Sequence, residues 1–426
     1  MRNKLFREKV KNVGFISTRF KGTDGVSLET RKWARVMKNM GLKCFYFAGR
    51  LDTPEKSSLL EPLADFQHPL ITEISNQCFS MSFRSRALTT RIHEVKDRLK
   101  DALYAFMESF EIHLLVAENC LAIPLNLPLG LAITEVVGET GIQTVGHHHD
   151  FFWERKRFLV NSVWDYLNMA FPPHLPTVHH VVINSSGDNQ LSLRTGISAI
   201  TIPNVMDYDH PPGEPDEYAK DVRQAMGLKD GDIFILQPTR VVQRKGIEHA
   251  IELTHRLGKK AKLVITHGSG DEGQSYLARV RSYADTLNAD LVLAADIVGT
   301  KRGKTSDGRK IYRLPDLYQF ADLVTFPSSF EGFGNAFLEA LYFKKPILVN
   351  NYSVYAVDIR PKGFWTIEID DYITDETVDF TQKILGDKVL RTEMVEHNYE
   401  MARRYFSYSI LRDKLNAILN NCFGRH

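Results

Sequence analysis

Short apolar runs alternate with longer helical patterns along the whole chain, and this alternation constrains the fold more than any other feature. Residues 13–17 form a β-type run that leads into a Gly-rich turn, and residues 26–40 then show helical spacing that closes at Gly41. Further strand-like runs of the first half lie at residues 43–48, 113–117, 143–146 and 179–184. This β-α-β rhythm predicts a parallel sheet covered by helices.

The rhythm restarts after the apolar run at residues 199–204. Residues 209–221 are rich in Pro, Gly and acidic residues, which predicts an exposed linker, and residues 301–310 are charged without an apolar period, which predicts a mobile loop. Strand-like runs recur at residues 233–237, 262–266, 291–294, 323–327 and 346–350. We therefore expect an α/β protein with two Rossmann-like, doubly wound domains that face each other across a cleft. Ligands of such sheets bind at the carboxyl ends of the strands.

Composition excludes several classes of protein. The 426 residues carry a formal net charge of +2 and are 43% hydrophobic, which argues against a nucleic-acid binder and against a disordered chain. The longest uncharged apolar stretch, residues 119–134, contains two prolines and is shorter than the roughly 20 residues of a spanning helix. The N-terminus lacks the apolar core of a signal peptide, and four cysteines are scattered without a CxxC spacing. A cytoplasmic protein is expected.

The segment around residues 326–340 is the most informative for chemistry. A strand ends at Pro327, a loop with two glycines follows, and a helix is predicted to begin near Asn335 as its N-cap. Backbone N–H groups at such a helix start can cradle a diphosphate. Glu331 and Glu339 would lie about 12 Å apart on one helix, farther than the roughly 5–9.5 Å of a glycosidase acid–base pair. The spacing favours two ends of one ligand, and an acidic helix start with one solvated Glu remains the alternative.

Two further turns follow predicted strands. Arg240 and Lys245 come directly after residues 233–237 and can converge on one anion; a solvated basic turn is the alternative. The turn at residues 21–26 offers a phosphate or hydroxyl site at a helix N-terminus, or is simply a tight turn that needs glycine.

Three consecutive histidines follow the predicted strand at residues 143–146. If the strand continues, His147 and His149 lie on one face and His148 on the other. No further ligand stands at a recognisable zinc spacing, so no metal is expected and His149 is interpreted as a hydrogen-bonding group for a polar ligand. Trp153 and Arg155 follow, and they offer an aromatic and cationic platform for a phosphorylated or carboxylated acceptor, or else a solvated basic helix start.

A GxGxxG pattern at Gly268, Gly270 and Gly273 follows another predicted strand. It leaves an NAD-dependent oxidoreductase as the alternative function. A zinc enzyme built on the histidines and a non-catalytic sugar-binding protein are further alternatives, although the latter has no need of Arg240 and Lys245.

Taken together, these residues resemble the retaining GT-B glycosyltransferases of glycosyltransferase family 4. Glu331 and Glu339 look like the E-x7-E motif of that family, and Arg240 and Lys245 stand where the family keeps its diphosphate-binding Arg and Lys. The resemblance implies an acceptor-side domain of residues 1–203, completed by a C-terminal helix at 406–426, and a nucleotide-sugar-binding domain of residues 204–405.

The resemblance also implies roles for individual residues. Those implied to be catalytic are His149, Arg240, Lys245 and Glu331. Those implied to bind the donor are Gly25, Arg240, Lys245, Glu331, Gly332, Phe333, Gly334, Asn335 and Glu339, with the sugar at Glu331 and the ribose at Glu339. Those implied to bind the acceptor are Thr23, Asp24, His147, Asp150, Trp153 and Arg155.

The reaction implied is hexose transfer from a UDP- or GDP-sugar co-substrate to a hydroxyl, with formation of an α-glycosidic bond and no tightly bound cofactor. The partners implied are this donor and a small-molecule or glycan acceptor, and a homodimer is left open.

Overall fold

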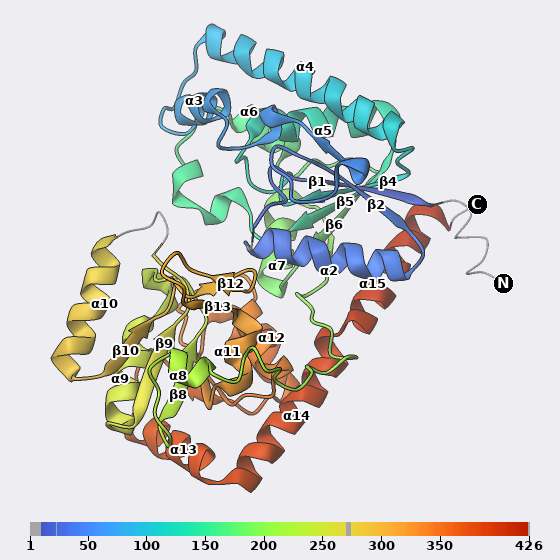
Figure 1. Cartoon of the computed structure of the whole chain (residues 1–426). Helices are drawn as coiled ribbons and strands as arrows, with labels where there is room; N and C mark the ends of the chain where they lie inside the picture. Colours follow the sequence, from blue (N-terminus) through green and yellow to red (C-terminus); the bar gives the residue numbers. More distant parts are fainter. Residues whose placement is uncertain (1–9, 23, 270–273, 425–426) are drawn as a thin grey trace. The chain divides into compact units, whose positions relative to one another are not determined.

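The computed structural model describes residues 10–22, 24–269 and 274–424. They form two compact units (Figure 1). Unit 1 contains the chain up to Asn204 together with the segment from Tyr408 onward, and unit 2 is Val205–Ser407. Each unit has its own parallel sheet with helices on both faces. Among the described residues, no helix is long and apolar enough to cross a membrane.

Unit 1 is built on a seven-stranded parallel sheet in the order β3-β2-β1-β4-β5-β6-β7. Its strands are β1 (Asn12–Ile16), β2 (Lys43–Ala48), β3 (Ser58–Leu60), β4 (Leu114–Glu118), β5 (Gln143–His148), β6 (Val178–Val182) and β7 (Ala199–Thr201). Its helices are α2 (Gly25–Asn39), α3 (Pro69–Cys78), α4 (Arg86–Ser109), α5 (Leu127–Thr140), α6 (Trp164–Ala170), α7 (Ser185–Thr195) and α15 (Tyr408–Phe423). The strand order reverses between β1 and β4, which is where ligands bind in such sheets.

The predicted strands of unit 1, and its predicted helix at residues 26–40, are confirmed to within a few residues. Helices α3, α4, α5 and α6 pack on one face of the sheet, and α2 and α15 lie together on the other (Figure 1). Helix α2 begins where Asp24 accepts a hydrogen bond from the Ser27 N–H at 3.1 Å, and it buries Trp33 and Met37 against the sheet. Strand β5 runs two residues further than predicted and includes His147 and His148.

Unit 2 is built on a six-stranded parallel sheet in the order β10-β9-β8-β14-β15-β16. Its strands are β8 (Ile233–Gln237), β9 (Ala261–Ile265), β10 (Asp290–Leu293), β14 (Leu323–Phe326), β15 (Ile347–Asn350) and β16 (Ile367–Ile369). Its helices are α8 (Val222–Ala225), α9 (Ile247–Leu257), α10 (Gln274–Leu287), α11 (Leu314–Phe320), α12 (Asn335–Tyr342), α13 (Asp375–Gly386) and α14 (Lys388–Phe406). Helices α9, α10 and α13 share one apolar core with the sheet.

The prediction of a mobile loop at residues 301–310 is wrong. Strand β12 (Gly303–Lys304) pairs antiparallel with β13 (Lys310–Arg313), and β11 (Val298–Gly299) pairs parallel with β13 on its other side. These strands are two to four residues long, and Tyr312 is their one buried residue, so they bury no apolar stripe that a periodicity could reveal.

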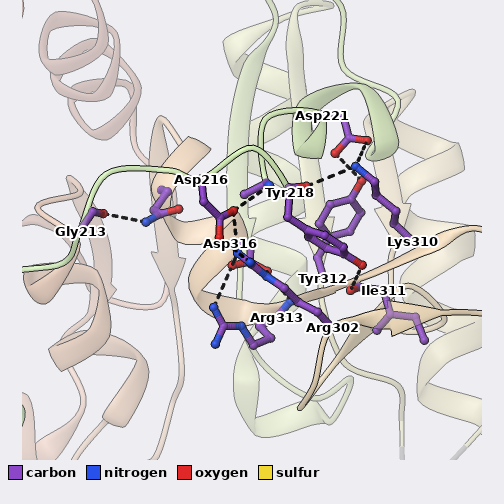
Figure 2. Close-up of polar contacts among 12 residues, drawn as sticks. Gly213, Asp216, Tyr218, Asp221, Arg302, Lys310, Ile311, Tyr312, Arg313 and Asp316 are labelled. Carbon is purple, nitrogen blue, oxygen red and sulfur yellow. Dashed lines mark hydrogen bonds and ion pairs between the residues drawn. The ribbon is translucent and has the colours of Figure 1, made fainter.

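Charge pairs hold the small sheet instead (Figure 2). Arg302 pairs with Asp216 and Asp316, and the Tyr218 hydroxyl donates to the carbonyl oxygens of Gly303 and Ile311 at 2.8 and 3.1 Å. Part of the predicted exposed linker, from residue 213 to residue 221, is therefore fastened to folded structure. It looked like a linker because its contacts are polar and lie more than 80 residues away along the chain.

Candidate functional site

Two loops at the carboxyl ends of neighbouring strands of unit 2 are fastened to each other. The Arg244 carbonyl oxygen, in the loop after β8, accepts a hydrogen bond from the Ser329 N–H, in the loop after β14, at 2.9 Å. Gly246 has a φ of +57°, and a Cβ there would lie 2.1 Å from the Pro327 carbonyl oxygen. Only glycine permits this approach, which fixes the position of the preceding residue, Lys245.

Lys245 and Glu331 form a buried ion pair between these loops. The Lys245 ammonium contacts Glu331 Oε1, and the Arg244 guanidinium lies 3.0 Å from the same oxygen. Each side chain of the Lys245–Glu331 pair is only 11% exposed. Burial by itself raises the pKa of Glu331, but Lys245 and Arg244 outweigh it and the pKa is lowered. Burial lowers the pKa of Lys245 despite the attraction of Glu331.

Arg240 adds a third positive charge to this cluster. Its side chain is exposed, and its charge lowers the pKa of Lys245 further. Among the described residues, Glu331 is the one carboxylate that pairs with Arg244 or Lys245, and Arg240 has no carboxylate partner. Three cations thus share this region with a single negative charge, an excess of two, which suits a doubly charged anion. That Arg240 and Lys245 converge on one anion stays a prediction.

His267 belongs to the same region and was not singled out from the sequence. It follows β9, and its Nδ1 lies 2.7 Å from the Thr266 hydroxyl. Burial lowers its pKa, and the charges of Arg240 and Lys245 lower it further. Its position just after a predicted strand, one residue before Gly268, is the sequence feature that could have identified it as a site residue. Gly270 and Gly273, the other glycines of the GxGxxG pattern, lie outside the described residues.

Helix α12 begins at the predicted place with a different cap. Gly334, with a φ of +123°, is the N-cap and Asn335 is the first helical residue, so the prediction of Asn335 as N-cap is wrong. A Cβ at Gly334 would lie 2.8 Å from the Tyr352 hydroxyl oxygen, which explains why a glycine stands there. The neighbouring Phe333 side chain is buried against Phe406, so only its backbone can meet a ligand, as can that of Gly332.

Glu331 and Glu339 do not share a helix. Glu331 lies in the loop before α12, whereas Glu339 is within the helix and half-buried. The Tyr318 hydroxyl donates to Glu339 Oε2 at 3.0 Å. Burial raises the pKa of Tyr318 well above its ordinary value, and the Glu339 carboxylate adds to this, so the hydroxyl keeps its proton as a donor. One Glu339 oxygen is thereby oriented from within the protein.

In unit 1, the histidines divide between the two faces of β5 as predicted. His147 Nδ1 lies 2.9 Å from Glu118 Oε2, and His149 Nε2 lies 3.6 Å from the same oxygen. On the other face, His148 Nε2 lies 2.9 Å from His180 Nδ1. His147 and His148 are fully buried, whereas the His149 side chain is 11% exposed. His149 is therefore the histidine of the three that a ligand can meet.

Glu118 is a site residue that the sequence reasoning missed. An acidic residue at the end of the otherwise apolar β4, whose five residues are all buried, was the signal that could have found it. Among the described residues, Glu118, His147 and His149 are the group whose ligand atoms lie close enough for a metal ion, within 4.8 Å of one another. Of the two histidines, His147 is hydrogen-bonded to Glu118, and His149 Nε2 makes a longer charge contact with the same oxygen.

Each of the remaining predicted acceptor residues that the structure describes has a partner within unit 1. Asp150 accepts from Asn119 Nδ2 at 3.0 Å and from Arg155 Nε at 2.6 Å. Trp153 stacks on the Phe151 ring at 4.5 Å. Asp24 caps α2, of which Gly25 is the first residue, and Thr23 lies outside the described residues.

Comparisons with known proteins give a consistent picture. The family described as Glycosyl transferases group 1 matches residues 307–401. The chain is 31% identical over 425 residues to the mannosylglucosylglycerate synthase of Thermotoga maritima, covering 92% of this chain and 96% of that protein. It is also 31% identical over 383 residues to the synthase of the same name from Petrotoga mobilis, covering 84% and 86%.

Two solved structures share the fold at low sequence identity. A glycosyltransferase from Rickettsia africae superposes with a TM-score of 0.67 at 14% identity, covering 98% of this chain and 100% of that one. Anabaena HepE in complex with UDP-glucose superposes with a TM-score of 0.63 at 12% identity, covering 96% and 99%.

Proposed function

The chain belongs to the group 1 glycosyl transferases and has the GT-B fold of two Rossmann-like domains, and from this premise we propose that it is a retaining hexosyltransferase. The donor would be a nucleoside-diphosphate sugar, and the acceptor a hydroxyl of a small acidic molecule. The product would carry an α-glycosidic bond.

The observation that carries this proposal is the excess of positive charge between the loops after β8 and β14. When the bond between sugar and phosphate breaks, negative charge grows on the departing diphosphate. Fixed cations that already point at that place lower the barrier without having to rearrange. Arg240 and Lys245 would supply this stabilisation, with Lys245 held by Gly246 and Glu331.

The other donor roles follow from the geometry of unit 2. Glu331 would face the donor sugar with the backbone of residues 332–334, and Glu339 would bind the ribose with the carboxylate that Tyr318 orients. This assignment includes the E-x7-E motif of glycosyltransferase family 4. We propose UDP or GDP as the nucleotide of the donor. The thermal-shift screen described below distinguishes between the two.

The proposal of retention rests on the carboxylates among and near the predicted acceptor residues, because each of them is already engaged within the protein. Asp24 caps a helix, Glu118 is buried behind two histidines, and Asp150 is held by Asn119 and Arg155. An inverting displacement needs a carboxylate base on the far face of the sugar. With these three engaged, attack on the same face as the leaving phosphate is favoured, because that phosphate can take the acceptor's proton.

The acidic nature of the acceptor is supported by the names of the relatives. Both are mannosylglucosylglycerate synthases, and a glycerate group carries a carboxylate. We extend this chemistry to the present chain as a small acidic acceptor, such as an organic acid glycoside, which fits the cations that follow His149 in sequence.

A thermal-shift screen followed by product analysis tests the function. UDP, GDP and ADP with their sugars, and NAD as the competing ligand, would be added at about 100 times the dissociation constant, where a true ligand stabilises by about 2.7 kcal/mol. The stabilising donor would then be incubated with glucosylglycerate and with uncharged sugars. A product whose proton NMR spectrum shows the α anomer supports the proposal. A β-linked product would contradict retention, and stabilisation by NAD alone would contradict the whole proposal.

A further inference from the structure

A buried carboxylate lies directly behind the exposed histidine of unit 1. Glu118 is 0% exposed, and its Oε2 faces both His147 Nδ1 and His149 Nε2, at 2.9 and 3.6 Å. Burial by itself raises the pKa of Glu118, but the two histidines outweigh it and the pKa is lowered. Glu118 is therefore a carboxylate at neutral pH.

An ionised carboxylate can only accept hydrogen bonds, so a ring nitrogen that faces it at hydrogen-bonding distance carries the proton. This argument assigns the proton to His147 Nδ1. His149 Nε2, at 3.6 Å, lies beyond hydrogen-bonding distance, but the negative charge of Glu118 favours a proton on that nitrogen. His147 has no room to turn, because it is fully buried and its ring stacks on Trp33 at 4.2 Å. Nε2 of His149 is also buried, so the exposed part of that ring lies away from Nε2 and leaves Nδ1 to meet a ligand.

The residue after Glu118 holds the backbone of the same histidine. The His149 N–H donates to Asn119 Oδ1 at 2.9 Å, and Asn119 Nδ2 donates to Asp150 Oδ1 at 3.0 Å. Asn119 reaches both groups with a φ of +58°, a conformation that asparagine tolerates better than most residues. The carboxyl end of β4 thus holds the ring of His149 through Glu118 and its backbone through Asn119.

We propose that Glu118 is a positioning residue for His149: it keeps the Nε2 side of the imidazole inside the protein, so that unprotonated Nδ1 accepts a hydrogen bond from a substrate hydroxyl. The inference rests on the proposed function, because the substrate is the nucleotide sugar or its acceptor. Glu118 itself touches no substrate, and its whole effect passes through His149.

A double-mutant cycle tests this dependence. Glu118→Gln, which keeps the shape and removes the charge, should lower kcat by about 10- to 100-fold, the loss typical when a histidine loses its orienting partner. In a His149→Ala background the same substitution should change kcat less than about twofold. His148→Gln is the matched control, since His148 is equally buried on the opposite face of β5 and bonds to His180. An equal loss from Glu118→Gln in both backgrounds would overturn the proposal.

A spectroscopic arm separates this inference from the proposed function. ¹⁵N-labelled histidine should show a protonated Nε2 and an unprotonated Nδ1 for His149 in the wild type, and a mixture of both forms in Glu118→Gln. This readout needs no turnover, so it stands even if no sugar is transferred. Unchanged ring-nitrogen chemical shifts of His149 in the variant would contradict the proposal. It would also be contradicted if the wild type contained one metal ion per chain and the His149 chemical shifts changed when a chelator removed that ion.

Discussion

Unit 2 contains two clusters of charged side chains that differ in their balance. In the loops after β8 and β14, Arg244 and Lys245 pair with one carboxylate, Glu331, and Arg240 lies close enough to lower the pKa of Lys245. In the small sheet β11–β13, three cations meet three carboxylates (Figure 2); the cations are Arg302, Lys310 and Arg313, and the carboxylates are Asp216, Asp221 and Asp316. The first cluster keeps an excess of two positive charges, and the second keeps none.

This difference distinguishes the proposed binding site from a structural brace. In the balanced cluster each charge is satisfied within the protein; the Lys310 ammonium, for example, bonds to Asp221 at 2.7 Å, and the Tyr312 hydroxyl bonds to the same carboxylate at 2.8 Å. In the unbalanced cluster, Lys245 is held in a buried position although burial disfavours its charge. This excess of cations supports the proposal that an anion completes the cluster.

The largest expected effect is on turnover. Arg240→Ala and Lys245→Ala should each lower kcat by about 10² to 10³, the usual loss when a preorganised charge partner of the transition state is removed. Lys310→Ala, from the balanced cluster, is the matched control and should keep kcat near the wild-type value. If both Arg240→Ala and Lys245→Ala kept near-normal rates at saturating donor, the first cluster would have no more effect on catalysis than the second, which would contradict the proposal.

Glu331 and Glu339, the two carboxylates assigned to the donor, should differ in their kinetic signature. Glu331→Gln should lower kcat by tenfold or more, because Glu331 is assigned to the reacting sugar. Glu339→Gln should raise the KM for the donor about tenfold with little change in kcat, because contacts to a ribose are equal in the ground state and the transition state. Initial rates over a range of donor concentrations measure both. If both variants changed kcat and KM in the same way, this would contradict the proposal that one donor molecule contacts both Glu331 and Glu339.

The pH dependence of stability should also distinguish wild type from Lys245→Ala. The lowered pKa of Glu331 stabilises the folded protein above the ordinary glutamate pKa of about 4.5, and this contribution is lost as the pH falls through the lower folded-state value. Without Lys245, burial favours the neutral acid. In the variant Glu331 therefore takes up its proton at a higher pH than in the wild type. The difference in unfolding free energy between the two proteins should shrink as the pH falls, beginning above about 4.5 and ending below the folded-state pKa of the wild type. Urea titrations from pH 7 to pH 3.5 measure it, and a constant difference is the contrary result.

The balanced cluster should affect stability only. Arg302→Met leaves Asp216 and Asp316 without their shared partner, and it should lower the midpoint of thermal unfolding by about 2–4 °C, the shift that 1 kcal/mol produces in a domain of this size. Its kcat should stay within about twofold of the wild type. A large loss of activity at an unchanged midpoint would mean that the small sheet takes part in the reaction.

The two clusters also show what the sequence could and could not predict. Arg240, Lys245 and Glu331 follow regular buried strands, so their common position at the carboxyl edge of a sheet could be inferred from periodicity. The small sheet could not be predicted in this way. Its strands are short and charged, and the residues that bond to them lie up to 93 residues away along the chain.

Unit 1 repeats this lesson. The alternation of His147, His148 and His149 followed from strand geometry. Their partner Glu118 could not be predicted in this way. It lies 29 residues from His147 along the chain, and the two meet only because β4 pairs with β5. The cap of α12 was misassigned because Asn335 is a good N-cap type, whereas the approach of Tyr352 requires the glycine before it.

Calorimetric titration of the nucleoside diphosphate is the most direct test of the claim that the unbalanced cluster is the diphosphate site. The account predicts that Arg240→Ala and Lys245→Ala each weaken binding of the preferred diphosphate at least tenfold, about 1.4 kcal/mol. Lys310→Ala and Arg302→Met should bind it like the wild type. Wild-type affinity in both Arg240→Ala and Lys245→Ala, with folded proteins confirmed by their unfolding midpoints, would contradict the account.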